Sequence, residues 1–453
     1  MCHRDSTTMR ALVALLAALL LIVRPVPITA DDGDDPVPAD PDATFHKLVK
    51  QAEAALDGKE YAEAARLFGL AVREKPADTA TAERFKDAIR HVEIYNTRFE
   101  PLRSQTQRRF GIDSAADVIR DGLGWLVRTQ QPDGRWINSK RADYRCDDLS
   151  TTALALLALM ADGSSEIVGT HKQAVKKGIA WILAHQTHAG SFGGGSNYSE
   201  GLAALAVVEA FAMGGTDATY NAAQKSLTFI LGTRCADGGW LYGGAEGKGN
   251  GDVSVTGMMF QPLKQAQAAW LDFNYDTLDE LANWIGRITP DAGSGANAGV
   301  VPYRPGTNSN FHNPSMAAIG SLVKLYAGRD AATDSELAGS IKAVADARDD
   351  LKTNVYFLYY GTMVAFLVGG ETWTTWAAPM VESVRSKQDR TAPADGAAPS
   401  ATFGRIYDAN DFWVSRGYIG PEVYHCMELL SLECAYRYVP KGMQKTERET
   451  GGE

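Results

Sequence analysis

The sequence predicts an all-α protein built from repeated helical units, and three observations lead to this fold class. A segment from Gly122 to Trp136 recurs from Lys177 to Phe192 and again from Lys225 to Trp240. Helix-length amphipathic stretches alternate with helix-length stretches that are apolar on nearly every side. At 453 residues, the chain is also long enough to bury a large core. A repeat at a fixed frame is typical of a stacked, quasi-periodic architecture.

The repeated frame has a direct physical interpretation. An aromatic and an aliphatic residue stand side by side, a glutamine follows four residues after the aliphatic one, and Gly-x-aromatic closes the unit; the third copy has Arg234 in place of glutamine. We expect the apolar pair on the buried stripe of a helix, and a glycine at positive φ where the chain reverses. The last aromatic should fold back over the helix end, and the glutamine should hydrogen-bond the loose backbone groups of the turn.

This frame closely resembles the QW motif of the squalene–hopene cyclase and protein prenyltransferase superfamily. The resemblance runs from about Phe110 to Pro440. It implies an α/α toroid, a closed ring of outer and inner helices. It does not imply one activity, because one fold hosts many functions.

Six helix pairs fit this toroid. The expected outer helices are Ala115–Gln130, Lys172–Gln186, Tyr220–Gly232, Leu278–Ile288, Glu336–Ala347 and Thr374–Gln388. The expected inner helices are Leu149–Met160, Ser199–Met213, Val253–Trp270, Pro314–Tyr326, Tyr356–Leu367 and Glu422–Tyr438. Four inner helices follow a residue suited to capping, namely Asp148, Asn197, Asp252 and Asn313. We therefore expect these four as N-caps, with Pro314 at a first helical position.

The N-terminus predicts export. Arg10 precedes an apolar run from Ala11 to Val23, which is too short for a spanning helix but suits a signal peptide over residues 1–30. An Asp- and Pro-rich linker follows over 31–42. Export would place the protein in the periplasm or outside the cell, with no transmembrane span after cleavage; an uncleaved anchor is the alternative. The net charge of −10 argues against nucleic acid as a partner.

Residues 43–104 predict a separate helical unit ahead of the toroid domain, which spans 105–440. Tyr61, Ala64, Phe68, Ala71 and Pro76 match the second half of a tetratricopeptide repeat, although the first half fits poorly. A generic helical hairpin and a peptide-binding module are equally good interpretations. Within the toroid, Thr289 to His312 is a Gly/Asn-rich insertion expected to overhang the mouth of the ring, and Asp389 to Ser400 is expected to be a mobile surface loop. The tail, 441–453, is polar.

The first candidate for chemistry is the pair Asp147 and Asp148 at the start of the first inner helix. It resembles the Asp-x-Asp-Asp motif of squalene–hopene cyclases, in which an aspartic acid protonates an alkene, and the resemblance implies Asp147 as donor. However, Arg145 replaces the first acid. A guanidinium stabilises a carboxylate and supplies no proton. Asp148 also has a sufficient structural role as an N-cap.

The second candidate is His425, which resembles a zinc-binding histidine of protein prenyltransferases. Those enzymes also need an Asp-x-Cys pair, and Asp252-Val-Ser254 has a serine where the thiolate would stand. The zinc site therefore lacks a ligand, so we expect no metal and no other cofactor. The alternative for His425 is a core histidine whose ring is satisfied within the protein.

Aromatic residues gather at the starts of inner helices and predict a hydrophobic binding site. The candidate ligand-binding residues are Tyr198, Asp252, His312, Tyr360, Trp413, Tyr418 and His425. We expect an exported toroid that binds a hydrophobic small molecule or another extracellular ligand. Two alternatives stay open: an isoprenoid cyclase or prenyltransferase that uses Asp147, and a scaffold that holds a protein partner through the helical hairpin.

Overall fold

The computed structural model describes residues 42–58, 61–75, 77–91, 97–140, 146–166, 169–214, 216–243, 249–269, 271–290, 300–307, 314–391 and 398–438. For residues 61–63, 66, 73, 86–87 and 89–91 the backbone alone is described. The predicted signal peptide, all but the last residue of the linker, and the tail lie outside these ranges. The chain divides into two units, Met1–Ala43 and Thr44–Glu453, and the ring of helices lies entirely within the second.

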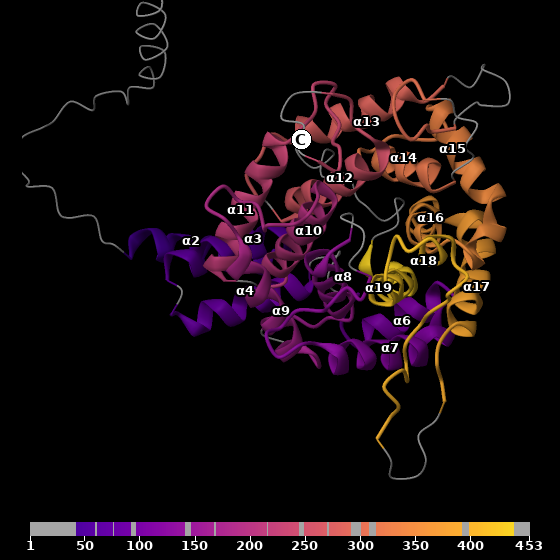
Figure 1. Ribbon diagram of the computed structural model, residues 1–453. Helices are drawn as coiled ribbons and strands as arrows, with labels where there is room; N and C mark the ends of the chain where they lie inside the picture. Colours follow the sequence, from indigo (N-terminus) through magenta and orange to yellow (C-terminus); the bar gives the residue numbers. More distant parts are fainter. Residues whose placement is uncertain are drawn as a thin grey trace, which may run out of the picture. The chain divides into compact units, whose positions relative to one another are not determined.

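Twelve of the described helices form six pairs arranged as a ring (Figure 1). The outer helices are α7 (Ala116–Thr129), α9 (Lys172–His185), α11 (Asp217–Gly232), α13 (Asp276–Ile288), α15 (Ser335–Asp346) and α17 (Gly370–Ser386). The inner helices are α8 (Asp148–Ala161), α10 (Asn197–Ala212), α12 (Val253–Ala268), α14 (Pro314–Tyr326), α16 (Val355–Val368) and α19 (Pro421–Leu432). Each inner helix packs against the next, and α19 packs against α8, so the ring is closed. The predicted α/α toroid of six outer and six inner helices is confirmed.

The inner helices are apolar nearly all round because they touch neighbours on both sides and an outer helix behind. In α8 every residue from Leu149 to Ala161 is buried. Close approach of neighbouring inner helices requires small residues in places. At Gly257 of α12 a Cβ atom would collide with Ile319 of α14. The outer helices bury one stripe only, as in α7 with Val118, Ile119 and Leu126.

The turn chemistry expected from the repeats is observed. Gln130 donates through Nε2 to the carbonyl of Gly134 at 2.8 Å and to that of Ala174 at 2.9 Å. Gly134 has φ of 101°, and the indole of Trp136 donates to the carbonyl of Leu126 at 2.7 Å. In the second copy Gln186 makes both of the glutamine bonds, to the carbonyls of Gly190 and Ala222. In the third copy Nε of Arg234 donates to the carbonyl of Gly238, and its Nη1 donates to Glu280 on α13. Each turn therefore links its own helix to the next repeat.

A further turn of this kind follows α17 and closes the ring. Gln388 donates to the carbonyls of Val118 and Gly404, and Ile406 is fully buried where the other turns have an aromatic residue. The glutamine and the glycine are separated here by an insertion, so the sequence pattern conceals this copy. The described ends of the segment expected to be a mobile loop, residues 389–391 and 398–400, thus lie between the glutamine and the glycine of a repeat turn, while residues 392–397 lie outside the described ranges.

Four described helices precede the ring: α2 (Ala43–Asp57), α3 (Tyr61–Glu74), α4 (Thr79–His91) and α6 (Leu102–Arg109). Helices α3 and α4 pack together, and Phe68, Ala64 and Ala71 of α3 are buried. The tetratricopeptide character of this unit stays a prediction. The remaining short helices are η1 (Asp113–Ala115), η3 (Arg348–Lys352), α18 (Phe412–Ser415) and α20 (Cys434–Arg437). Among the residues described, no helix combines the length and the apolarity needed to cross a bilayer.

Candidate functional site

The N-terminal ends of the inner helices meet at one face of the ring, which we call the mouth. The cap of α8 lies one residue earlier than the sequence suggested. Asp147, not Asp148, is the N-cap: its Oδ1 accepts the amide of Ser150 at 2.8 Å, and Ser150 Oγ accepts the amide of Asp147. Asp148 instead accepts the amide of Asn138 at 2.8 Å. This contact between Asp148 and Asn138 of the preceding turn accompanies the start of α8 at Asp148. The local sequence pattern gives no sign of the contact.

Two other expected caps can be compared. The cap of α10 is Ser196 rather than Asn197, again one residue earlier. Asp252 is the N-cap of α12, as expected, and its Oδ1 accepts the amide of Val255. Pro314 begins α14, also as expected, while Asn313 lies outside the described residues.

Asp147 has a second role as a latch between repeats. Its Oδ2 accepts the amide of Gly195 in the following turn at 2.8 Å. Other inner helices begin with a comparable bond to a neighbouring turn or segment: Asn197 Nδ2 to Leu241 O, Val253 N to Tyr303 O, Val355 N to Asp411 Oδ2, and Ser139 N to Glu422 Oε2. Both oxygens of Asp147 therefore accept backbone N–H groups, an arrangement in which a carboxylate binds most strongly. This geometry explains Asp147 without a catalytic role.

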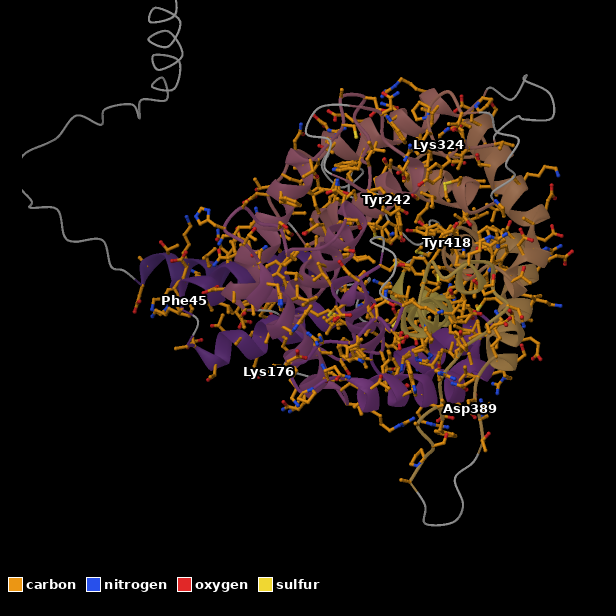
Figure 2. All side chains as sticks on the ribbon, viewed as in Figure 1. Phe45, Lys176, Tyr242, Lys324, Asp389 and Tyr418 are labelled. Atoms are coloured by element: carbon orange, nitrogen blue, oxygen red, sulfur yellow. The ribbon has the colours of Figure 1, made fainter. Side chains whose placement is uncertain are left out.

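Six aromatic side chains form a continuous cluster at the mouth: Tyr198, Tyr242, Tyr356, Tyr360, Trp413 and Tyr418. Tyr198 stacks on Tyr242 with ring centroids 5.9 Å apart. Tyr356 lies 4.9 Å from Tyr360 and 5.2 Å from Trp413, and Trp413 lies 5.8 Å from Tyr418. Tyr242 and Tyr418 lie inside the ring of helices in Figure 2. The four aromatic residues selected from the sequence are thus brought together, with Tyr242 and Tyr356 added.

Two members of this cluster close the axis of the ring. Tyr198 of α10 and Tyr360 of α16 reach across the ring, and their hydroxyls lie 3.4 Å apart. Gln261 of α12 lies below them, with Nε2 at 3.5 Å from the hydroxyl of Tyr360. Tyr198 is 6% exposed and Tyr360 0% exposed, so side chains fill the axis at this level.

Asp252 adjoins the cluster at the start of α12. Its Oδ1 accepts the hydroxyl of Ser254 at 2.7 Å, and Ser254 lies 3.3 Å from the hydroxyl of Tyr242. Asp252 is fully buried, and burial raises the pKa of its carboxyl. The other oxygen lies 3.9 Å from Arg304. Asp252 thus supports an aromatic residue of the mouth through a serine at the position where a zinc site would need cysteine.

His425 lies away from the mouth cluster, between α19 and α7. Its Nδ1 accepts the amide of Ile406 at 2.9 Å, so Nε2 carries the proton and donates to the carbonyl of Gly122 at 3.1 Å. Burial lowers the pKa of His425 to about 3. In two other repeats a threonine hydroxyl takes the place of the His425 ring. The hydroxyl of Thr152 accepts the backbone amide of Trp136, and that of Thr256 accepts the backbone amide of Trp240.

This geometry corrects the placement of His425 among the ligand-binding candidates. Its ring is fully buried and both nitrogens are engaged by the protein. It holds a repeat turn against an inner helix, which is the satisfied core histidine considered as the alternative. His312 lies outside the described residues.

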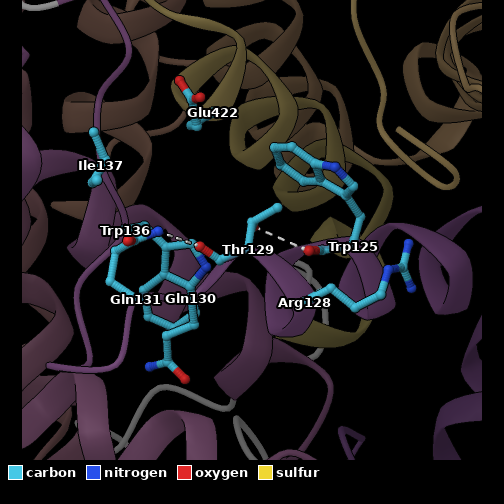
Figure 3. Close-up of a pocket in the computed structure, with 8 residues that line it drawn as sticks. All are labelled: Trp125, Arg128, Thr129, Gln130, Gln131, Trp136, Ile137 and Glu422. Atoms are coloured by element: carbon cyan, nitrogen blue, oxygen red, sulfur yellow. Dashed lines mark hydrogen bonds between the residues drawn. The ribbon is translucent and has the colours of Figure 1, made fainter. Parts of the chain in front are cut away.

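A separate cavity of about 310 Å³ lies where the ring closes (Figure 3). Its lining residues are Trp125, Arg128, Thr129, Gln130, Gln131, Trp136, Ile137 and Glu422. Most of their polar groups are used internally: the indoles of Trp125 and Trp136 donate to carbonyls, and Glu422 accepts from Ser139. The cavity therefore offers fewer recognition groups than its composition suggests.

Sequence reasoning missed Gln261 and Tyr242 at the mouth. Gln261 is the one polar residue between Gly257 and Leu263 in α12, and this polar interruption was a usable signal. Tyr242 stands two residues beyond the third repeat turn, among glycines, and nothing local distinguishes it.

Comparison with known proteins supports the superfamily that the repeats indicate. Residues 94–203 match the family model of the squalene-hopene cyclase C-terminal domain. No curated protein matches the chain by sequence.

Three solved structures to which this chain is similar are described with different activities. A type II terpene cyclase from Scytonema is 13% identical, with a TM-score of 0.47, covering 72% of this chain and 98% of that one. An α-1,6-mannanase of Salegentibacter is 9% identical, with a TM-score of 0.47 and coverage of 71% and 98%. An α-amylase from Clostridium perfringens is 11% identical, with a TM-score of 0.49 and coverage of 70% and 97%. At these identities none of their activities transfers to this chain, because a shared fold hosts many functions.

Proposed function

We propose that this protein binds a hydrophobic, isoprenoid-like ligand across the mouth of the ring and does not cyclise it. The observation that carries the proposal is the continuous aromatic cluster over a closed axis. Tyr242, Tyr356, Trp413 and Tyr418 are each half-buried, so part of each ring faces outward. Aromatic surface of this kind binds apolar chains because covering it removes apolar area from water.

The competing proposal is an isoprenoid cyclase that uses Asp147. Protonating an alkene requires an acid that still carries its proton and faces the substrate. Both oxygens of Asp147 accept backbone amides instead. A cyclase also folds its substrate inside an apolar cavity, whereas Tyr198 and Tyr360 close the axis here. We therefore expect binding without turnover.

Binding is tested with the full-length protein, geranylgeraniol and squalene, by tryptophan fluorescence and native mass spectrometry. Trp413→Leu should weaken binding at least tenfold, because it removes a ring from the centre of the cluster. Trp181→Leu is the matched control: Trp181 is also partly buried but lies on outer helix α9, where it stacks on His185. Equal binding by both variants, or none by the native protein, would reject the proposal.

Turnover is tested by incubating the same ligands with the protein and analysing the products by mass spectrometry. We expect unchanged substrates. A cyclised product that disappears in Asp147→Asn would establish the cyclase instead.

We further propose that the protein is exported, on the basis of the apolar run Ala11 to Val23 and the small residue Ala30. N-terminal sequencing of protein from the native host should find a mature end near Asp31. An intact N-terminus in a cytosolic fraction would contradict export.

A further inference from the structure

The cavity at the closure of the ring is walled by the first outer helix and the last inner helix. Trp125 and Arg128 belong to α7, Gln130 and Gln131 follow it, and Glu422 lies in the first turn of α19. The volume of about 310 Å³ is within the range of small-molecule sites in proteins. What the cavity can bind depends on which groups of its wall are not already bonded to the protein.

Most neutral hydrogen-bond donors of the wall are already used. The indoles of Trp125 and Trp136 each donate to a backbone carbonyl, and the hydroxyl of Thr129 does the same. The side-chain nitrogen of Gln130 donates to two carbonyls, which uses both of its hydrogens. A ligand that needs to accept hydrogen bonds would therefore find few partners among these groups.

Oxygen acceptors remain in the same wall. Because Gln130 must turn its nitrogen toward the two carbonyls, its Oε1 is left over. Gln131 likewise donates through Nε2 to the carbonyl of Thr129 at 3.1 Å. The amide and the hydroxyl of Ser139 donate to Oε2 of Glu422 at 3.2 and 2.9 Å, which holds the carboxylate in place. In the described part of the chain no hydrogen bond uses Oε1 of Glu422 or of either glutamine.

The charge of the wall is negative on the side of Glu422. Glu422 supplies a full negative charge, and α7 ends at Thr129, so the negative end of its dipole lies at the cavity. Arg128 carries the opposing charge, but its guanidinium donates to the carbonyl of Phe403 and lies 5.9 Å from that ring. Figure 3 shows its side chain extending away from Glu422 and from the glutamines.

We propose that this cavity binds a small organic cation, an ammonium group on a compact apolar body. The ammonium group donates to Glu422 and to the glutamine oxygens, as charge-assisted hydrogen bonds favour. The apolar body lies against the indoles of Trp125 and Trp136, and aromatic faces also attract cations. The cavity shares no residue with the aromatic cluster of the mouth, so this inference is independent of the proposed function.

The experiment compares three probes that share a phenylethyl body: phenethylamine, 2-phenylethanol and 3-phenylpropionate, which are cationic, neutral and anionic at neutral pH. Isothermal titration calorimetry of the full-length protein at low salt gives the dissociation constants. The amine should bind about tenfold or more tightly than the alcohol, and the anion should bind most weakly. Added salt should weaken binding of the amine and leave that of the alcohol unchanged.

Two variants change the charge of the wall in opposite directions. Glu422→Gln keeps an oxygen for Ser139 but removes the negative charge, so the affinity for the amine should fall about tenfold, to that of the alcohol. Arg128→Gln removes a repelling charge and should raise the affinity for the amine about two- to threefold. Glu371→Gln is the matched control, because Glu371 is also the acidic residue in the first turn of a helix, α17, but does not line the cavity. Melting temperatures check that each variant is folded.

Several outcomes would overturn the cation site. These are equal affinity of the native protein for amine and alcohol, tighter binding of 3-phenylpropionate, and an equal loss in Glu422→Gln and Glu371→Gln. Weaker binding of the amine by Arg128→Gln would show that the arginine holds the ligand, which contradicts a purely cationic one. Trp413→Leu should bind the amine as the native protein does, and a loss there would place the amine at the mouth instead.

Discussion

The two ends of the ring are built from opposite kinds of side chain. At the mouth, half-buried neutral aromatic rings contact one another, and their hydroxyls make long bonds of 3.4 to 3.5 Å. At the other end, which we call the base, Glu209 lies between two arginines: Arg98 at 2.7 Å and Arg437 at 2.9 Å. All three charged side chains are 1% exposed.

This difference separates a fixed end from an adaptable one. Buried charges are costly unless every partner is in place, so the base tolerates one geometry. Aromatic contacts are less directional, and a ring can shift with little loss. Arg98 also precedes the first repeat, so the base joins the segment before the ring to residues of the ring itself. We infer that the base secures the architecture and that the mouth is free to carry function.

The largest effect is expected from Glu209→Leu. This change removes the carboxylate that pairs with both buried guanidinium groups, although the buried carboxyl of Glu433 also acts on them, and it should destabilise the protein by about 3–5 kcal/mol. Chemical denaturation at neutral pH measures it. The control is Glu53→Gln, which breaks an exposed pair with Arg84 and should cost under about 1 kcal/mol. Similar costs for the two variants would mean that the base is not the fixed end.

The next largest effect concerns His425 and pH. Its folded pKa of about 3 lies below the ordinary value of 6.5, so the unfolded chain binds the proton more readily. Its contribution to stability is therefore present above pH 6.5 and is lost as pH falls toward 3. Between pH 7 and pH 5 the loss should be about 2 kcal/mol.

The comparison variant for this experiment is His425→Gln, measured by denaturation at both pH values. Burial raises the pKa of Asp162 and Asp411 to about 6, and these carboxyls act with the opposite sign. Only the difference between native protein and variant isolates the histidine. An identical pH dependence in both would show that His425 is not held neutral.

A smaller effect distinguishes Asp147 from Asp148 at the mouth. Asp147→Ala removes a helix cap and the latch to Gly195, and should cost about 1–2 kcal/mol. Asp148→Ala removes a bond to Asn138 and should cost less. Thermal unfolding of both variants decides between the capping assignment from the structure and the one from the sequence, which gives the reverse order.

The smallest effect is expected within the aromatic cluster. Tyr360→Phe removes two bonds that are already at the limit of hydrogen-bonding distance, so its cost should stay below about 1 kcal/mol. Chemical denaturation under the conditions used for Glu209→Leu measures it. A loss of stability as large as that of Glu209→Leu would contradict the proposed difference between the mouth and the base.

The local features of this protein could be predicted from its sequence. Most predicted helix bounds lay within four residues of those observed, because an amphipathic or apolar periodicity depends on consecutive residues. The exception is the last inner helix, predicted as Glu422–Tyr438, which ends at Leu432 and is followed by the separate short helix α20. The bonds that Gln130 and Trp136 make within the turn followed from the same logic, since these residues lie in one short segment; the bond from Gln130 to Ala174 of the next repeat did not. The cap of α12 at Asp252 was also local and was predicted correctly.

The candidate site was predicted in part. Tyr198, Tyr360, Trp413 and Tyr418 were selected because aromatic residues recur at inner-helix starts, and the ring brings such starts together. The sequence did not reveal which rings meet across the axis, nor that Gln261 lies below them. Those contacts join helices α10, α12 and α16, so their geometry depends on ring closure.

The tertiary structure decided every feature that depends on a partner distant in the chain. It moved the cap of α8 to Asp147, because Asn138 binds Asp148, and it used His425 to hold the turn at Ile406 rather than a ligand. It also joined Gln388 to Gly404 across an insertion, and placed Arg98 beside Glu209. The amino-acid sequence by itself determined the period, the helices and the turns, because these depend on neighbouring residues. Ring closure decided the contacts between distant residues, because it fixes which side chains are buried together in one low-dielectric interior.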